Sequence, residues 1–106
     1  MAKFLVIANY SPEGIKGVLS TGGTARVDAV KEAVKSLGGT VESFYFGFGV
    51  DDAYVVIDLP DNAAAASLAM AVSSTGLAAT RVVVLLAPGE VDEAAKRQVA
   101  YRPPGR

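Results

Sequence analysis

The sequence predicts a single α+β domain with the element order β-α-β-β-α-β and a further helix at its C-terminal end. Three observations support this. Strand-forming runs occur four times, two segments with helical spacing of apolar residues separate the outer runs from the inner pair, and the inner pair is close enough to form a hairpin. With 106 residues, 51% of them hydrophobic, the chain can form one hydrophobic core.

Residues 3–10 form a nearly continuous apolar run, which indicates a central strand covered on both faces. Ser11 is expected to cap a short helix that begins at Pro12, because proline at that position loses no intrahelical hydrogen bond. The paired glycines within residues 20–24 then interrupt the helix.

A second helix is expected to begin at Thr24 as its cap and to end at Gly38 and Gly39, since a left-handed residue after a helix favours glycine. Its polar residues, Arg26 among them, are expected to face mostly water. Its apolar face comprises Val27, Val30, Val34 and Leu37.

Residues 40–61 predict a β-hairpin. Two runs rich in β-branched and aromatic residues, 41–48 and 53–59, flank a tight reversal at residues 49–52. The rest of the domain is expected to pack on this hairpin.

Asp61 is expected to cap an alanine-rich helix that Gly76 ends. Residues 62–80 carry no charge, but small side chains and a glycine favour a buried helix over a membrane span. Residues 81–87 predict a strand that is also buried on both faces. Pro88 begins the C-terminal helix, whose apolar stripe comprises Val91, Ala94, Ala95 and Val99.

The predicted organisation is one domain over residues 1–100 and an extended, proline-rich tail over residues 101–106. The order corresponds to a ferredoxin-like fold, with a four-stranded antiparallel sheet and helices on one face. If the first and fourth strands are apolar on both sides, a second sheet must cover the other face. We therefore expect a homodimer.

Composition excludes several classes of function. The chain has no cysteine, histidine or tryptophan, so it lacks thiolate nucleophiles, the usual general base and the commonest transition-metal ligands. A net charge of -1 provides no reason to expect nucleic acid or a membrane as a partner. Without a recognisable export signal or anchor, the expected location is cytoplasmic. We also expect no cofactor.

The chain resembles the GYD domain family, small bacterial and archaeal proteins of mostly unknown function. In the family motif, Gly49 and Asp52 match, whereas Asp51 occupies the place of the motif tyrosine and a tyrosine follows at Tyr54. The resemblance implies a dimeric α/β barrel formed by two ferredoxin-like sheets, and no particular activity. It extends over residues 5–15, 26–39, 44–45, 49–53 and 60–61.

Two candidate catalytic residues lie on the third predicted strand. Tyr54 and Asp58 share one face, and Val55, Ile57 and Leu59 share the other, which should face the helices. Inside a barrel, the Asp58 carboxyl group among aromatic neighbours could act as an acid or base. The alternative is a solvated carboxylate near the barrel mouth.

Three further residues are candidate ligand-binding groups: Asn9, Tyr45 and Arg81. Asn9 could instead stabilise the turn at Ser11. Arg81 could pair with Asp58 or bind a substrate carboxylate. The sequence leaves open whether Tyr45 or the neighbouring phenylalanines point into the barrel. Two adjacent aspartates in a turn are typical turn formers, so we expect no metal site.

These patterns favour a barrel protein that binds a small molecule. One form would be a cofactor-free enzyme acting on an apolar or carbonyl-bearing compound. The alternative is a non-catalytic interaction or regulatory module whose barrel interior is filled by its own side chains.

Overall fold

The computed structural model describes all residues from Met1 to Arg106. The four strands form one antiparallel sheet in the order β2-β3-β1-β4, which confirms the predicted ferredoxin-like α+β fold. Both helices predicted between the first two strands are present, as α1 and α2. The elements are β1 (Ala2–Tyr10), α1 (Pro12–Thr21), α2 (Gly23–Ser36), β2 (Thr40–Phe46), β3 (Ala53–Leu59), α3 (Asn62–Ser74), β4 (Ala78–Leu85) and α4 (Pro88–Lys96).

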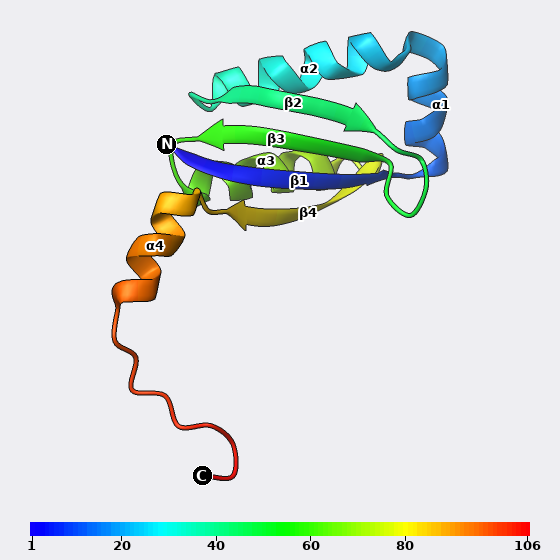
Figure 1. Ribbon diagram of the computed structural model, residues 1–106. Coiled ribbons are helices and arrows are strands. Elements are labelled where there is room, and N and C mark those ends of the chain that lie inside the picture. Colours follow the sequence, from blue (N-terminus) through cyan, green and yellow to red (C-terminus); the bar gives the residue numbers. More distant parts are fainter.

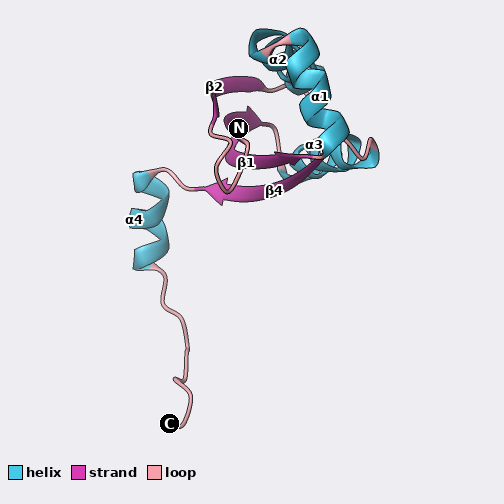
Figure 2. Ribbon diagram, turned by 90° about the vertical axis from the view of Figure 1, so that its right-hand side faces the viewer, coloured by secondary structure: helices cyan, strands magenta, loops and turns pink.

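Helices α1, α2 and α3 all lie on one side of the sheet (Figures 1 and 2). Helix α2 packs along β2, while α3 packs along β4 and β3. No helix covers the opposite side, which we call the open face. Strand pairing and alternation assign to it Lys3, Leu5, Ile7, Asn9, Tyr45, Tyr54, Val56, Asp58, Arg81, Val83 and Leu85.

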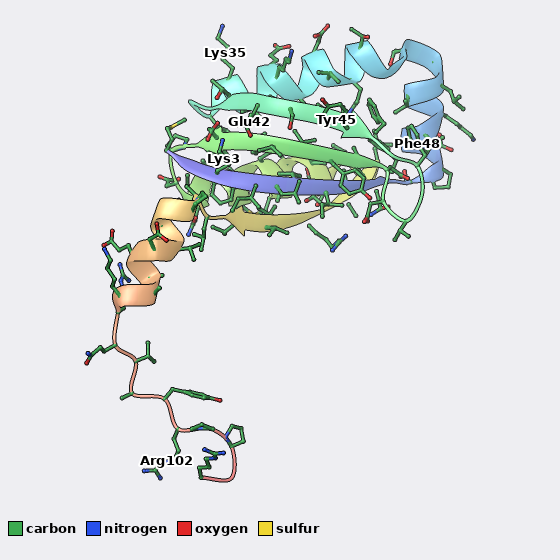
Figure 3. All side chains as sticks on the ribbon, viewed as in Figure 1. Lys3, Lys35, Glu42, Tyr45, Phe48 and Arg102 are labelled. Atoms are coloured by element: carbon green, nitrogen blue, oxygen red, sulfur yellow. The ribbon has the colours of Figure 1, made fainter.

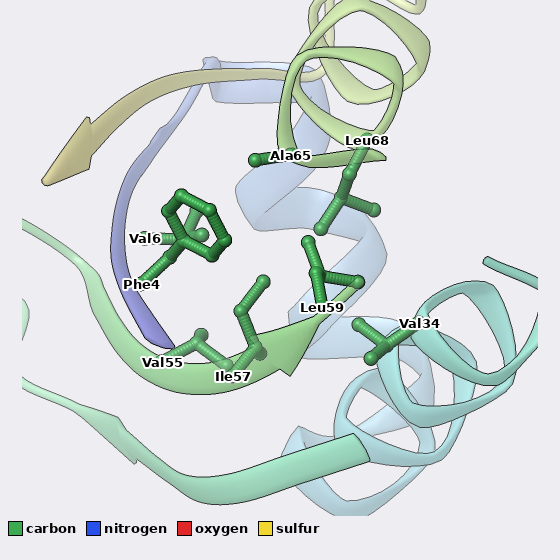
Figure 4. Close-up of a cluster of buried hydrophobic side chains, with 8 residues drawn as sticks. All are labelled: Phe4, Val6, Val34, Val55, Ile57, Leu59, Ala65 and Leu68. Atoms are coloured by element: carbon green, nitrogen blue, oxygen red, sulfur yellow. The ribbon is translucent and has the colours of Figure 1, made fainter. Parts of the chain in front are cut away.

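The hydrophobic core lies between the sheet and the helices (Figure 4). Its most completely buried side chains come from β1, α2 and β3, and they include Phe4, Val34, Ile57 and Leu59. Along β3 buried and less buried residues alternate. The prediction that Val55, Ile57 and Leu59 face the helices is therefore confirmed.

Two of the three predicted helix caps are confirmed. The Ser11 hydroxyl accepts a hydrogen bond from the Gly14 amide at 3.2 Å, and the Asp61 carboxylate accepts one from the Ala64 amide at 2.8 Å. Thr24 was the wrong cap for α2, because the helix begins one residue earlier. Gly22, with φ of 85°, ends α1, where its amide donates a hydrogen bond to the Val18 carbonyl, and it is also the residue before α2.

The hairpin reversal is longer than predicted. Strand β2 ends at Phe46, and a loop of residues 47–52 connects it to β3, with Phe48 in a left-handed conformation (φ 53°). The Gly47 amide donates to the Asp52 carbonyl at 2.9 Å, but the Asp52 amide donates to Ala8 of β1 at 3.0 Å. The loop is thus held by β1 as well as by its own ends, which the local sequence does not reveal.

Strand β4 corrects the prediction of a strand buried on both faces. It runs from Ala78 to Leu85, three residues earlier than expected at its start, because its first residues pair with the end of β1. Only one neighbouring strand flanks it, so β4 is an edge strand and Val83 is 42% exposed. Helix α3 is likewise buried on one side only, through Ala65 and Leu68.

Helix α4 extends away from the sheet, and the residues after it continue outward (Figure 1). It contains no buried residue, and its first turn is capped by the Glu90 carboxylate, which accepts from the Ala87 amide at 3.0 Å. Val99, predicted on its apolar stripe, lies beyond the last helical residue. None of the four helices combines the length and the hydropathy needed to cross a bilayer.

Candidate functional site

All five predicted site residues lie on the open face. In the strand register, Tyr45 pairs with Tyr54, Tyr54 pairs with Ile7, and Ile7 pairs with Arg81, so one row crosses the entire sheet. Tyr45 is 72% exposed (Figure 3), and the alternation of β2 therefore turns Phe44 toward the core. The structure thus settles the orientation of β2 that the sequence leaves open.

Asp58 belongs to an ion-pair cluster at one end of the open face. The Lys3 ammonium lies 3.0 Å from the Asp58 carboxylate and 3.2 Å from that of Glu42; Lys3 and Glu42 are marked in Figure 3. Hydrogen bonds to Asp58 and then to Glu42 raise the pKa of Lys3. Asp58 and Tyr54 lie four positions apart along an extended strand, about 13 Å, so one chain does not bring these two candidate catalytic groups together.

Asn9 and Arg81 meet at the other end of the open face, through Asp51. One Asp51 carboxylate oxygen accepts from the Asn9 amide group at 2.8 Å, and the other accepts from the Arg81 guanidinium at 2.9 Å. Because of the Asn9 hydrogen bond, and secondarily Arg81, the pKa of Asp51 is lowered. Of the partners that the sequence left open for Arg81, Asp58 is not the one it pairs with, since the hairpin loop brings Asp51 to β4.

The two loop aspartates do more than form a turn. The Asp51 side chain is only 13% exposed, and the Asp52 carboxylate accepts from the Tyr10 amide at 2.8 Å. Together they attach the loop to β1 and β4. The sequence signal for this role was weak, because adjacent aspartates are also common in loops that contact nothing.

A cavity of about 150 Å³ lies on the other side of the sheet, between β1, β3, β4 and the helices α2 and α3. Of its 17 lining residues, 15 are hydrophobic, and the two others are Arg26 and Thr80. Tyr10 adds a phenol group to the wall. None of the five predicted site residues lines this cavity.

Arg26 corrects the expectation that the polar residues of α2 face water. It is partly buried, and its Nε atom has no hydrogen-bond partner in the protein. The guanidinium carbon lies 6.0 Å from the centre of the Tyr10 ring, within cation–π range. The helical spacing could have indicated that Arg26 faces the sheet. Ala29 and Val30, three and four residues later, share its helical face and also line the cavity.

A wider groove of about 380 Å³ adjoins the cavity along α1 and α3. Tyr10 and Arg26 line both hollows, and therefore stand where the cavity meets the groove. The groove contains one carboxylate, that of Glu13, which is paired with the exposed Lys16 at 3.1 Å.

Comparison with known proteins identifies the family. The sequence model of the GYD domain matches residues 4–95, which is most of the chain. The chain belongs to the GYD domain family. Neither the comparison with curated proteins nor that with solved structures found a significant match.

In this GYD domain the motif residues Gly49 and Asp52 lie in the loop between β2 and β3. Asp52 attaches that loop to Tyr10, and Asp51, at the place of the motif tyrosine, joins Asn9 to Arg81. The structure contains no group of three or more side chains of the kinds that bind metal ions.

Proposed function

We propose that this GYD domain binds a small, largely apolar molecule in the cavity between its sheet and helices. The observation that carries the proposal is a partly open hollow of about 150 Å³ with nearly all of its wall hydrophobic. Engineered apolar cavities of about this size bind benzene. The adjoining groove provides a route for entry and space for a longer ligand.

The open face supports this function less well. Asn9, Arg81 and Asp58, which the sequence suggested as polar site residues, are already engaged with Asp51 or Lys3. The separation of Asp58 and Tyr54 prevents them from acting on one atom within a chain. A cofactor-free reaction would therefore use groups at the cavity, of which Tyr10 and Arg26 are the polar candidates.

Fluorobenzene, followed by ¹⁹F NMR, tests cavity binding. We expect the protein to bind it and Ala69→Leu, which fills part of the cavity from α3, to weaken binding by about 10-fold or more. Ala66→Leu is the matched control, because Ala66 lies on the exposed side of the same helix. Absence of binding to the unmodified protein, or equal binding by Ala69→Leu, contradicts the proposal.

We also propose that the open face pairs with the open face of a second copy, as expected from the sequence for both the ligand-binding barrel and the interaction module. Leu5, Val56, Val83 and Leu85 form its apolar centre, whereas Ile7 between them is already buried. Uncovered apolar surface of this kind favours association.

The polar groups of the open face suit a two-fold arrangement. The Lys3 cluster lies at one end of the strands and the Asp51 cluster at the other, and the apolar residues lie between them. A symmetric pair can thus bury the centre while both ion clusters remain at the rim. Helix α4, which has no partner within its own chain, offers a further surface for the second copy.

A further inference from the structure

We propose that Arg26 binds the anionic head group of the cavity ligand, and that the ligand is a monocarboxylate with a small apolar or aromatic body. This inference rests on the proposed function, because it concerns the same cavity. It adds the chemical class of the ligand and the residue that selects it.

Arg26 differs from the cationic side chains that form ion pairs, because it has no carboxylate partner. Lys3, Lys16 and Arg81 each lie within 4.0 Å of a carboxylate oxygen, whereas Arg26 has no such partner although it is partly buried. The Nε atom of Arg26 is buried without a hydrogen-bond partner, and a charged guanidinium with an unpaired buried N–H is unfavourable. An anionic group that enters the cavity would supply that partner.

The position of Arg26 determines how a ligand would lie. Because Arg26 and Tyr10 stand where the cavity meets the groove, a charged head group can bind there while an apolar body occupies the cavity. The Tyr10 and Thr80 hydroxyl groups are the other hydrogen-bonding side chains of the wall. Glu13, the one carboxylate of the groove, forms its ion pair with Lys16 and none with Arg26.

Charge and size both favour a monocarboxylate. A guanidinium group binds a carboxylate through two parallel hydrogen bonds, and one cation balances one negative charge. A phosphate dianion would leave a second charge without a cation, because no other cationic side chain lines the cavity or the groove. The volume of about 150 Å³ limits the apolar body to roughly the size of a benzene ring.

The experiment compares 4-fluorobenzoate with the neutral 4-fluorobenzamide and with fluorobenzene, again by ¹⁹F NMR. We expect the benzoate to bind about 10-fold or more tightly than the benzamide, since hydrogen bonds to charged groups are the stronger ones. Arg26→Met should remove that preference and leave fluorobenzene affinity within about 2-fold. Arg26→Lys should restore part of it.

Arg97→Met is the matched control, because Arg97 is an exposed arginine at the end of α4, away from the cavity. It should leave all three affinities unchanged. Thermal unfolding of each variant shows whether it is folded, and Arg26→Gln replaces Arg26→Met if the latter is not.

The outcomes separate the two proposals. If fluorobenzene binds but the benzoate has no advantage, or if Arg26→Met keeps that advantage, the role of Arg26 is overturned and the cavity remains a binding site. If none of the three probes binds at millimolar concentration, the proposed function fails, and the role of Arg26 fails with it.

Discussion

Asp51 joins three parts of the fold with one carboxylate. It holds the loop between β2 and β3 against Asn9 of β1 and Arg81 of β4. Both bonds involve an ionised group and are therefore stronger than bonds between neutral groups. Asp51 thus holds the loop, β1 and β4 together at this end of the open face.

The lowered pKa of Asp51 predicts a loss of stability in acid. The unfolded chain binds a proton at the ordinary pKa of 3.8 and the folded chain only at lower pH. The stabilisation is therefore complete well above pH 3.8 and is lost as pH falls through the folded-state pKa. Asp51→Asn should lower the urea midpoint at pH 7 and differ less from the unmodified protein at pH 3.

Asp28→Asn is the control for Asp51→Asn, because Asp28 is exposed on α2 and forms no ion pair. Its effect should be small at both pH values. An Asp51→Asn effect of equal size at pH 7 and pH 3 would contradict the ion-pair explanation.

At the scale of elements, α1 is positioned by the loop before β4. The Ser11 amide donates to the Leu77 carbonyl at 2.9 Å, and the backbone of Gly14 approaches the same carbonyl so closely that a Cβ atom would collide with it. Gly17, one turn later in α1, has open space around it. One helix thus contains two glycines with opposite structural requirements.

These glycines predict opposite effects of alanine. Gly17→Ala should stabilise the protein by about 0.5–1 kcal/mol, because alanine is the better helix former. Gly14→Ala gains the same propensity but must displace backbone, so a net destabilisation of about 1–3 kcal/mol is expected. Urea unfolding of both variants measures the difference. Stabilisation by both substitutions would mean that α1 does not approach Leu77 so closely in solution.

At the scale of the whole molecule, the sheet has one face covered by α1, α2 and α3 and one face without a helix (Figure 2). The cavity lies on the covered side, and the apolar centre with its two ion clusters lies on the other. The proposed ligand binding and the proposed association would therefore use different faces of one sheet. A change on the open face should alter assembly and leave the cavity intact.

Val83→Lys tests the pairing of open faces. We expect a dimer of the unmodified protein at micromolar concentration in analytical ultracentrifugation, and a dissociation constant at least about 10-fold higher for the variant, because each copy would bury an unpaired charge. Val84→Lys is the control, since Val84 is 56% exposed and points to the opposite side of the same strand. A monomeric unmodified protein would exclude this interface.

Local patterns in the sequence determined much of the architecture. The alternation in β3 predicted which of its residues enter the core, and Ser11 and Asp61 marked two helix starts. These features depend on neighbours within four residues, where chain geometry fixes the spacing between side chains. For the same reason, the placement of Tyr54 and Asp58 on one face followed from the sequence alone.

Contacts between distant segments were decided only in the tertiary structure. Strand order made β4 an edge strand, and the loop brought Asp51 to Asn9 and Arg81, 42 and 30 residues away. The packing of α2 on the sheet turned Arg26 toward Tyr10 and left the cavity beside it. Periodicity determines which face of an element is apolar, but only the packing of whole elements determines which polar groups meet and where space remains.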